Sequence, residues 1–290
     1  MVIARLMGGL GNQLFQYAAG RTIALANETV LKLDISTYET SPRGYRLDKY
    51  NIQAETASPG EVSRLTGTGG GKCGRLRRAI RARLHLQDRR VGRERHYHFD
   101  PAMLTAPDGV YLDGYWQTER YFNEIDDVIR EELTPREDPD SANRAALSEI
   151  SKCRSVSLHI RRGDYVSNPT YSKFHGLCPM DYYENAVRQI SAEVEQPRFF
   201  IFSDDPEWVR ENLKLDHPTT YINHNGEEKD YEDLRLMSAC ENHIIANSSF
   251  SWWGAWLCRN PKKVVIAPRK WFNDPSNDTK DLIPNSWRRL

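Results

Sequence analysis

Apolar and polar positions alternate along the chain in blocks that predict strands and helices in turn. Near the start, apolar runs at 2–7 and 30–35 predict two buried strands. Between them, apolar residues at helical spacing predict a helix over 14–26. A strand, a helix and a strand in this order favour a right-handed crossover onto a parallel sheet.

The second half of the chain shows the same alternation more regularly. Strands alternate there with helices of 10–15 residues, which predicts a doubly wound parallel sheet. The predicted strands cover 155–160, 198–203, 243–247 and 263–268. The predicted helices cover about 181–195, 206–214, 231–241 and 248–258.

Three of these strands end in polar segments, HIRRGD, FSDD and ANSSFS. Ligands of such sheets bind beyond the carboxyl ends of the strands. We therefore expect the three segments to form one ligand-binding edge.

The middle of the chain is less informative. Residues 36–110 carry no clear motif, and 110–122 predicts a strand followed by an aromatic-rich turn and a helix. Residues 133–143 contain two prolines and mixed charge, which is typical of the approach to a domain boundary. We predict two α/β domains, 1–145 and 146–290.

Composition narrows the class of protein. The 40 basic and 40 acidic residues balance to a net charge of zero, which argues against binding nucleic acid over the whole surface. Five cysteines without a CxxC pair predict reduced thiols rather than a disulfide framework or a zinc site. The sequence has neither a signal peptide nor an apolar run long enough to span a membrane, so we expect a cytoplasmic protein.

The glycine-rich stretch GGLGNQ joins the first predicted strand to the first predicted helix. It is neither a dinucleotide fingerprint, since Leu14 stands where the last glycine is required, nor a Walker A loop, since no Lys-Ser/Thr follows. The amides of Gly8, Gly9 and Gly11 would open onto a helix N-terminus, which suits an anion. A plain tight turn is the alternative.

The stretch LHIRRGDY follows a predicted strand directly. In a strand, His159 and Arg161 share a face and could reach one ligand together, while Arg162 points away. Arginine is always charged and grips phosphate in bidentate fashion. The alternative is a surface ion pair of either arginine with Asp164.

The FSDD segment has three interpretations. It could hold a metal, Asp204 could bind a guanine edge or ribose hydroxyls, or one of Ser203, Asp204 and Asp205 could cap the helix that starts at Pro206.

The ANSSFSWWGAWL segment opens a helix with Ser248 and Ser249, where hydroxyls and free amides favour phosphate. Its three tryptophans, at helical spacing, predict core packing rather than a sugar platform.

Taken together, MGGLGNQLFQYAAG, GYWQTERYF, LHIRRGDYV, FSDD, LMSACENHIIANSSFSWWGAWL and VIAPRKWF resemble the bacterial α-1,2-fucosyltransferases of glycosyltransferase family 11. The resemblance runs from about residue 2 to residue 273. It implies a GT-B architecture, in which two Rossmann-like domains face a central cleft. It also implies inverting transfer of L-fucose from GDP-fucose to a galactose hydroxyl, without a divalent metal or other cofactor. The acceptor side would be the N-terminal domain and the donor side the C-terminal domain.

The resemblance also implies roles for individual residues. Arg161 would stabilise the diphosphate together with Ser248 and Ser249, and His159 and Asp204 would contact the nucleoside. The implied donor set further includes Gly8, Gly9, Gly11 and Phe250.

The catalytic base is not settled by the sequence. Asp164 is one candidate, although it could instead hold Arg161 or Arg162, and Asn12 could orient the acceptor without taking a proton. No DxD motif stands at a predicted strand end, so we expect no metal ligands.

The one strongly basic run covers 72–96, and aromatic residues are not interleaved with its charges. It could lie on anionic lipid as an amphipathic helix or pack over the first domain, and we expect no nucleic-acid partner.

The expected acceptor is a galactose-containing oligosaccharide or a lipid-linked glycan of O-antigen biosynthesis. The enzyme would then work in the cytoplasm or at the inner face of the bacterial plasma membrane. The alternatives are another linkage on the same fold and a silent GDP-sugar-binding protein.

Overall fold

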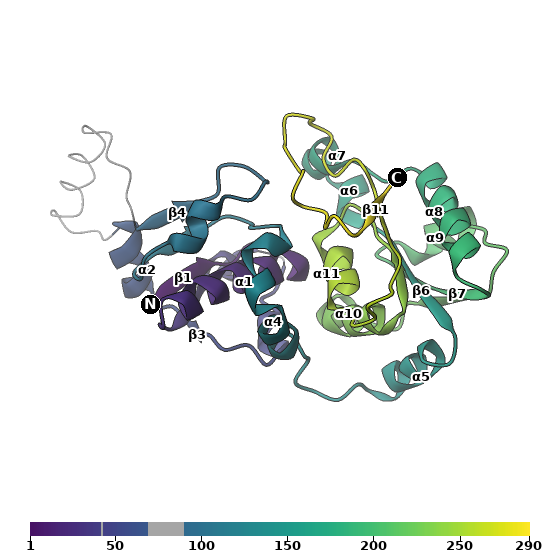
Figure 1. The fold of residues 1–290 in the computed structure, drawn as a ribbon, viewed down its shortest axis with the longest axis horizontal. Helices are drawn as coiled ribbons and strands as arrows, with labels where there is room; N and C mark the ends of the chain where they lie inside the picture. Colours follow the sequence, from purple (N-terminus) through teal and green to yellow (C-terminus); the bar gives the residue numbers. More distant parts are fainter. Residues whose placement is uncertain (42, 69–89) are drawn as a thin grey trace. The chain divides into compact units, whose positions relative to one another are not determined.

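The computed structural model describes residues 1–290 except residue 42 and residues 69–89, and it divides into two compact units (Figure 1). The first unit is Met1–Thr134 and the second is Pro135–Leu290. The division lies earlier than 145/146 because the segment before Ser141 is bonded to the second unit: Asp140 pairs with Lys229, with 2.9 Å between Oδ2 and Nζ.

The first unit contains a five-stranded sheet in which every pair of neighbours is parallel. In sheet order the strands are β3 (Glu55–Thr56), β2 (Leu31–Asp34), β1 (Val2–Arg5), β5 (Tyr111–Asp113) and β4 (Val91–Arg93). The predicted strands near the start of the chain are thus confirmed as β1 and β2, which pair from Val2 opposite Leu31.

The helices of the first unit include one whose start differs from the sequence prediction. Helix α1 begins at Leu10, not at Leu14, and its N-cap is Gly9. Of the glycines in this stretch, Gly8 and Gly9 therefore precede the helix, and Gly11 lies within its first turn. The α-helices are α1 (Leu10–Ala26), α2 (Pro59–Thr66) and α4 (Asp126–Glu132). The short 3₁₀ helices are η1 (Ser36–Glu39), η2 (Leu47–Lys49), η3 (Pro101–Thr105), η4 (Glu119–Tyr121) and η5 (Asn123–Ile125).

The second unit contains a six-stranded sheet, again with parallel neighbours throughout. In sheet order the strands are β11 (Arg288–Arg289), β10 (Val265–Ala267), β9 (Asn242–Ile244), β6 (Arg154–Ile160), β7 (Pro197–Ser203) and β8 (Thr219–Ile222). Because the chain moves outward from β6 to β8 on one side and from β9 to β11 on the other, the topological switch point lies between β6 and β9.

Helices cover both faces of this second sheet. On one face α8 and α9 bury Val156, Leu158 and Ile160 of β6. On the other face α5 and α10 bury Phe200 and Phe202 of β7, as the two-residue period of a strand requires. The α-helices are α5 (Ser141–Ile150), α6 (Gly163–Ser167), α7 (Pro169–His175), α8 (Met180–Glu193), α9 (Pro206–Asn212), α10 (Asp230–Ala239) and α11 (Ser249–Leu257), with the 3₁₀ helix η6 at Glu227–Lys229.

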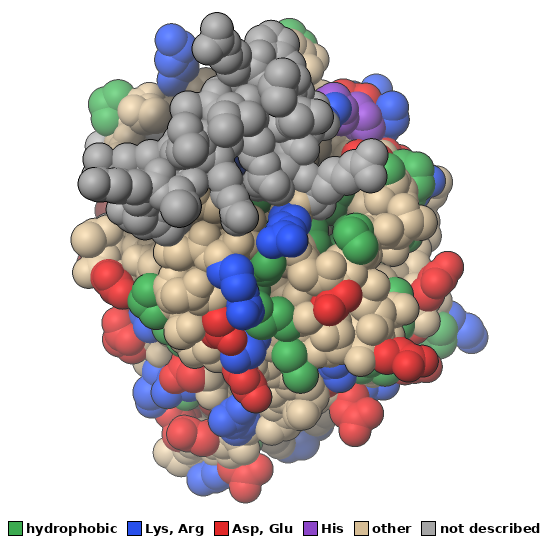
Figure 2. Space-filling model, turned by 90° about the vertical axis from the view of Figure 1, so that its left-hand side faces the viewer, with side chains coloured by type: hydrophobic (Ala, Val, Ile, Leu, Met, Phe, Trp, Pro, Cys, Tyr) green, Lys and Arg blue, Asp and Glu red, His purple; other side chains and the backbone are tan. Residues whose placement is uncertain are grey.

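Charges of both signs are interspersed on the described surface of the face in Figure 2, in keeping with the zero net charge. Most of the basic run at 72–96 lies outside the described residues. Among those that are described, no helix is both long and apolar enough to cross a membrane.

Candidate functional site

The three polar segments predicted to meet do lie at neighbouring strand ends. Strand β6 lies between β9 and β7, and all three run parallel, so their carboxyl ends share one edge of the sheet. The register places Ile160 opposite Ser203. The next residues of each strand, Arg161 and Asp204, therefore leave the sheet side by side.

The two arginines of this edge pair with the two aspartates in register. Arg161 Nη1 lies 3.0 Å from Asp204 Oδ2, and Arg162 Nε lies 3.1 Å from Asp205 Oδ2. The Arg162 guanidinium also stacks 3.5 Å over the Trp208 ring. The arginines thus find these two partners in the loop between β7 and α9, and the alternative ion pair with Asp164 stays untested. Asp164 lies in α6, and its side chain is not described.

Asp204 and Asp205 have different functions. Asp205 caps α9 by accepting a hydrogen bond from the Trp208 backbone N–H, which confirms the predicted helix cap. Asp204 instead accepts from the Arg162 backbone N–H at 2.8 Å and holds Arg161 with its other oxygen. Asp204 therefore fixes both the backbone and the guanidinium group of the HIRRGD segment.

His159 is a buried polar side chain near the end of β6, two residues before Arg161. Burial, with the Arg161 charge adding to it, lowers the pKa of the imidazole to about 3, so the ring is neutral at physiological pH. Its ring lies 5.7 Å from that of Phe250. Its Nδ1 atom is buried without a hydrogen-bond partner among the described residues. Such a buried polar atom is costly unless a ligand or water satisfies it.

The segment after β9 opens α11 as predicted. Ser248 is the N-cap, and its hydroxyl accepts a hydrogen bond from the Phe250 backbone N–H. Ser249 begins the helix, so the positive end of its dipole lies at the carboxyl edge of the sheet. Trp252 and Trp253 are fully buried, which confirms that the tryptophans form core.

Asn247 connects this edge to the segments around it. Its side-chain amide donates to the carbonyl oxygens of His175 (3.1 Å), Gly176 (3.2 Å) and Trp271 (3.2 Å). It is 3% exposed, and its Oδ1 accepts a bond from Cys178 Sγ. Asn247 is therefore a buried structural residue.

The glycine-rich stretch lies at the carboxyl edge of the first sheet, between β1 and α1. Gly8 has φ +81°, and a Cβ there would lie 2.4 Å from Asn12 Nδ2, so only glycine fits. Gly9 is the helix cap, while Gly11 is buried within the first turn of α1. Asn12 stands on that turn, and its Oδ1 accepts a hydrogen bond of 2.8 Å from Gln117 Nε2.

Three residues at this edge escaped the sequence interpretation. Tyr38 donates to the Gly8 carbonyl at 2.9 Å, Gln117 bonds Asn12, and Glu94 holds the turn that carries Gln117. Glu94 lies within the basic run at 72–96, for which the sequence interpretation used only the positive charge. A carboxylate immediately after a short strand was the signal that could have identified it.

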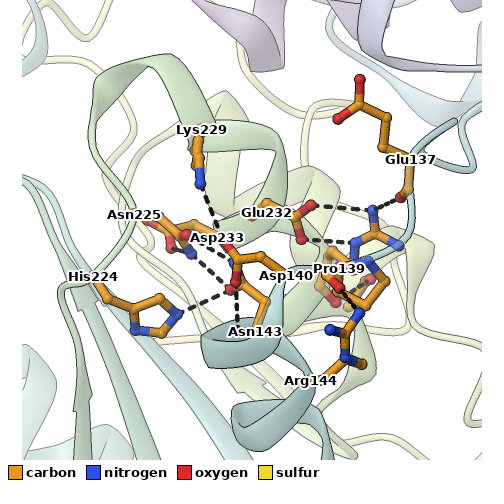
Figure 3. Close-up of polar contacts among 12 residues, drawn as sticks. Glu137, Pro139, Asp140, Asn143, Arg144, His224, Asn225, Lys229, Glu232 and Asp233 are labelled. Atoms are coloured by element: carbon orange, nitrogen blue, oxygen red, sulfur yellow. Dashed lines mark hydrogen bonds and ion pairs between the residues drawn. The ribbon is translucent and has the colours of Figure 1, made fainter.

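A polar network surrounds the turn after β8, at the same edge of the second sheet (Figure 3). Asn143, fully buried at the start of α5, accepts from His224 Nε2 at 3.0 Å and from Asn225 Nδ2 at 2.9 Å. Asn225 also donates to Asp233 Oδ1 of α10 at 2.8 Å. These bonds fix the turn from β8 to α10.

Asp233 permits a stability prediction. Burial raises its pKa to about 7, and the charges of Asp230 and Glu232 act in the same direction. Because the folded pKa lies above the unfolded value, the native state holds a proton that the unfolded chain releases, so stability falls as pH rises from about 4 to 7. Asp233→Asn keeps an oxygen to accept the Asn225 bond and removes the buried charge. We expect it to stabilise the protein by on the order of 2 kcal/mol at pH 8.

The measurement is thermal unfolding of Asp233→Asn and wild type at pH 8 and pH 4, with the exposed Asp216→Asn as the control. The gain should be present at pH 8, shrink at pH 4 and be absent from the control. A variant less stable than wild type at pH 8 would show that the ionised carboxylate stabilises the network.

Metal ligands do not converge at this edge. Within residues 1–41, 43–68 and 90–290, no group of three or more His, Cys, Asp and Glu side chains is arranged to hold an ion.

The two parallel α/β units have counterparts among solved structures. The α-1,6-fucosyltransferase NodZ, solved from Bradyrhizobium and soaked with GDP-fucose, superimposes with a TM-score of 0.52 at 13% identity over 95% of both chains. A mutant of Arabidopsis thaliana FUT1 in complex with GDP gives 0.54 at 12% identity, over 99% of this chain and 75% of that one. The fold is therefore that of a GT-B glycosyltransferase.

Sequence comparison identifies the family. The model of Glycosyl transferase family 11 matches residues 90–290, and the chain belongs to this family of enzymes. An "Alpha-1,2-colitosyltransferase" of Escherichia coli is 38% identical over 300 residues, covering 100% of this chain and 99% of that protein. The "O-antigen biosynthesis glycosyltransferase WbnK" of Escherichia coli is 34% identical over 309 residues, covering 98% and 99%.

Proposed function

We propose that the chain is an inverting α-1,2-fucosyltransferase that moves L-fucose from GDP-fucose to O-2 of galactose in an acceptor glycan. The observation that carries this proposal is the edge where Arg161, fixed by Asp204, lies one strand away from the N-terminus of α11. A rigid guanidinium and a helix N-terminus are two independent anion-binding groups. Together they suit the two phosphates of a nucleoside diphosphate.

The donor is held at the carboxyl edge of the second sheet. Arg161 and the first-turn amides at Ser248 and Ser249 bind the diphosphate. The unsatisfied Nδ1 of His159 bonds the nucleoside, and Phe250 packs beside it. Asp204 keeps Arg161 in place, and its remaining lone pairs are available to ribose or guanine.

The transfer step depends mainly on stabilising the charge that develops in the transition state, and less on covalent catalysis by the protein. The bond from the anomeric carbon to the diphosphate oxygen breaks, the acceptor oxygen bonds to the opposite face of that carbon, and the hydroxyl proton leaves. Negative charge grows on the departing GDP, where Arg161 and the α11 amides stabilise it without rearranging. Asn12 orients the acceptor hydroxyl, and Asp164 is the candidate to take its proton.

The acceptor is a surface polysaccharide under assembly, as the name of the relative WbnK, an O-antigen biosynthesis glycosyltransferase, indicates for that protein. We place the reaction in the cytoplasm or at the inner face of the bacterial membrane. Contact with anionic lipid through residues 72–96 stays a prediction, because most of that segment lies outside the described residues.

Colitose is the second candidate for the transferred sugar. It is the 3-deoxy counterpart of fucose, and the 38% identical relative is named as a colitosyltransferase. The two donors differ by one hydroxyl group, so they would use the same diphosphate site. A site built to bond that hydroxyl would reject the sugar that lacks it.

One experiment tests the proposal. GDP release is measured with GDP-fucose and with GDP-colitose, on a panel of galactose-terminated acceptors with EDTA present, and product linkages are determined. Acceptor-dependent release with an α-1,2 fucosyl product is the expected result. A strong preference for GDP-colitose would assign the second candidate, and GDP binding without transfer from either donor would indicate a silent binding protein.

A further inference from the structure

Glu94 is a carboxylate that the proposed reaction does not yet use. It follows β4 directly, at the carboxyl edge of the first sheet. Its Oε2 accepts a hydrogen bond from the Tyr115 backbone N–H at 2.7 Å, and its Oε1 accepts one from the Trp116 backbone N–H at 2.8 Å. Both oxygens therefore hold one turn, the turn after β5.

The turn that Glu94 holds is strained and tightly packed. Trp116 adopts φ +57°, a left-handed conformation that is uncommon for a bulky residue, and it is 2% exposed. A Cβ at Gly114 would lie 2.4 Å from Glu94 Cβ. The two backbone hydrogen bonds to Glu94 offset the strain and fix where the next residue, Gln117, points.

Gln117 connects this turn to the glycine-rich stretch by a hydrogen bond. Its Nε2 donates to Asn12 Oδ1 at 2.8 Å, and the Asn12 backbone N–H donates to the Gly9 carbonyl at 3.0 Å. Glu94 is thus connected to Asn12 through the backbone of the Tyr115–Gln117 turn and the side chain of Gln117. Each of these residues lies at or beyond the carboxyl ends of β1, β4 and β5.

Glu94 is held at a cost that a purely structural carboxylate avoids. Burial raises its pKa to about 7, although the two backbone N–H groups act to lower it. Glu61, which caps α2 in the same unit, shows the opposite: its bonds to Lys32 and Ser58 lower its pKa to about 2. Carboxylates with raised pKa values in ligand-binding edges are functional candidates.

We propose that Glu94 is a positioning residue for the acceptor sugar, acting through the Tyr115–Gln117 turn on the Asn12 side chain. This inference rests on the proposed function, in which Asn12 orients the acceptor hydroxyl. The ligand concerned is the hydroxyl-bearing sugar and not the nucleotide, because the groups that the proposed function gives to the nucleotide, Arg161, Ser248 and His159, stand on the second sheet.

The test compares acceptor and donor kinetics of Glu94→Gln and Gln117→Ala with wild type. Glutamine keeps the size of Glu94 but replaces one accepting oxygen with a donor, so one backbone N–H of the turn loses its partner. We expect kcat to fall 10- to 100-fold and KM for the acceptor to rise. KM for the sugar nucleotide and the Kd for GDP should stay within about twofold of wild type.

A double variant makes the test specific to the proposed path. If both residues act through Asn12, Glu94→Gln/Gln117→Ala should lose no more than the worse single variant, whereas independent effects would multiply. Glu61→Gln is the matched control, because it removes a carboxylate that holds the Ser58 backbone N–H after β3, and β3 and β4 are the two opposite edge strands of the sheet. It should lower the melting temperature and leave both KM values unchanged.

Any one of three results would overturn the proposal. These are losses that multiply in the double variant, a donor KM that rises as much as the acceptor KM, and wild-type kinetics in Glu94→Gln. Failure of the proposed function looks different, since wild type itself would then transfer no sugar from either GDP-linked donor. Gln117→Ala leaves Glu94 and its two backbone hydrogen bonds in place, so it keeps the test available if Glu94→Gln does not fold.

Discussion

Arg161→Ala is expected to lower kcat at least 100- to 1,000-fold while the protein stays folded. Losing a fixed donor that faces developing transition-state charge costs about 3–4 kcal/mol of transition-state stabilisation. Arg161→Lys should also lose most activity, because a lysine keeps the charge but cannot bind Asp204 and a phosphate through one planar fork. The measurement is steady-state sugar transfer together with the Kd for GDP and the melting temperature.

The same strand offers the control for this prediction. Arg154 begins β6 at the opposite edge of the sheet, where its exposed side chain pairs with Glu241 at 3.5 Å. Arg154→Ala should leave transfer unchanged, because an exposed ion pair contributes little. Near-normal turnover of Arg161→Ala would remove that residue from the proposed mechanism.

The long buried strands and their helices were predictable because their patterns are strong. Strand β7 is a nearly continuous apolar run of the kind that a doubly covered parallel strand needs, and β6 places Val156, Leu158 and Ile160 at alternate positions. By contrast, β3 has two exposed residues and β11 consists of two half-buried arginines, so neither carries a hydrophobic signal. These strands exist because a neighbouring strand offers them backbone partners, and a single sequence does not show that.

The same limit applies to helix α1. Its first turn contains Gly11 and Asn12, which have poor helix propensity, so local pattern alone delays the predicted start to Leu14. In the structure the N-cap at Gly9 and the packing of the buried helix override that preference.

The sequence predicted which segments form the candidate site, but it did not predict which residues pair within it. Their common position at one edge of the sheet was predictable, because each of the segments HIRRGD, FSDD and ANSSFS follows a parallel strand. That Arg161 meets Asp204 depends on the register of β6 against β7, which only the pairing of Ile160 with Ser203 reveals. Glu94 was hidden for a related reason, because its partners are backbone N–H groups of a turn distant in sequence.

Gly163→Ala is expected to lower transfer 10- to 100-fold, although alanine normally stabilises a helical position by up to about 1 kcal/mol over glycine. Gly163 begins α6, immediately after the two arginines. A Cβ there would lie 2.4 Å from Asp204 Oδ2, the oxygen that pairs with Arg161 at 3.0 Å. The methyl group must displace the carboxylate, and Arg161 then loses the partner that holds it toward the diphosphate.

Gly226→Ala provides the control, because a Cβ at that position meets nothing within 4 Å and its φ of −83° suits any residue. It should leave transfer and the Kd for GDP unchanged. Asp204→Ala tests the route: if the methyl group acts through this carboxylate, Gly163→Ala should add no further loss in the Asp204→Ala background. A further loss there would mean that Gly163 is needed for the course of the backbone into α6, and not for the space that Asp204 occupies.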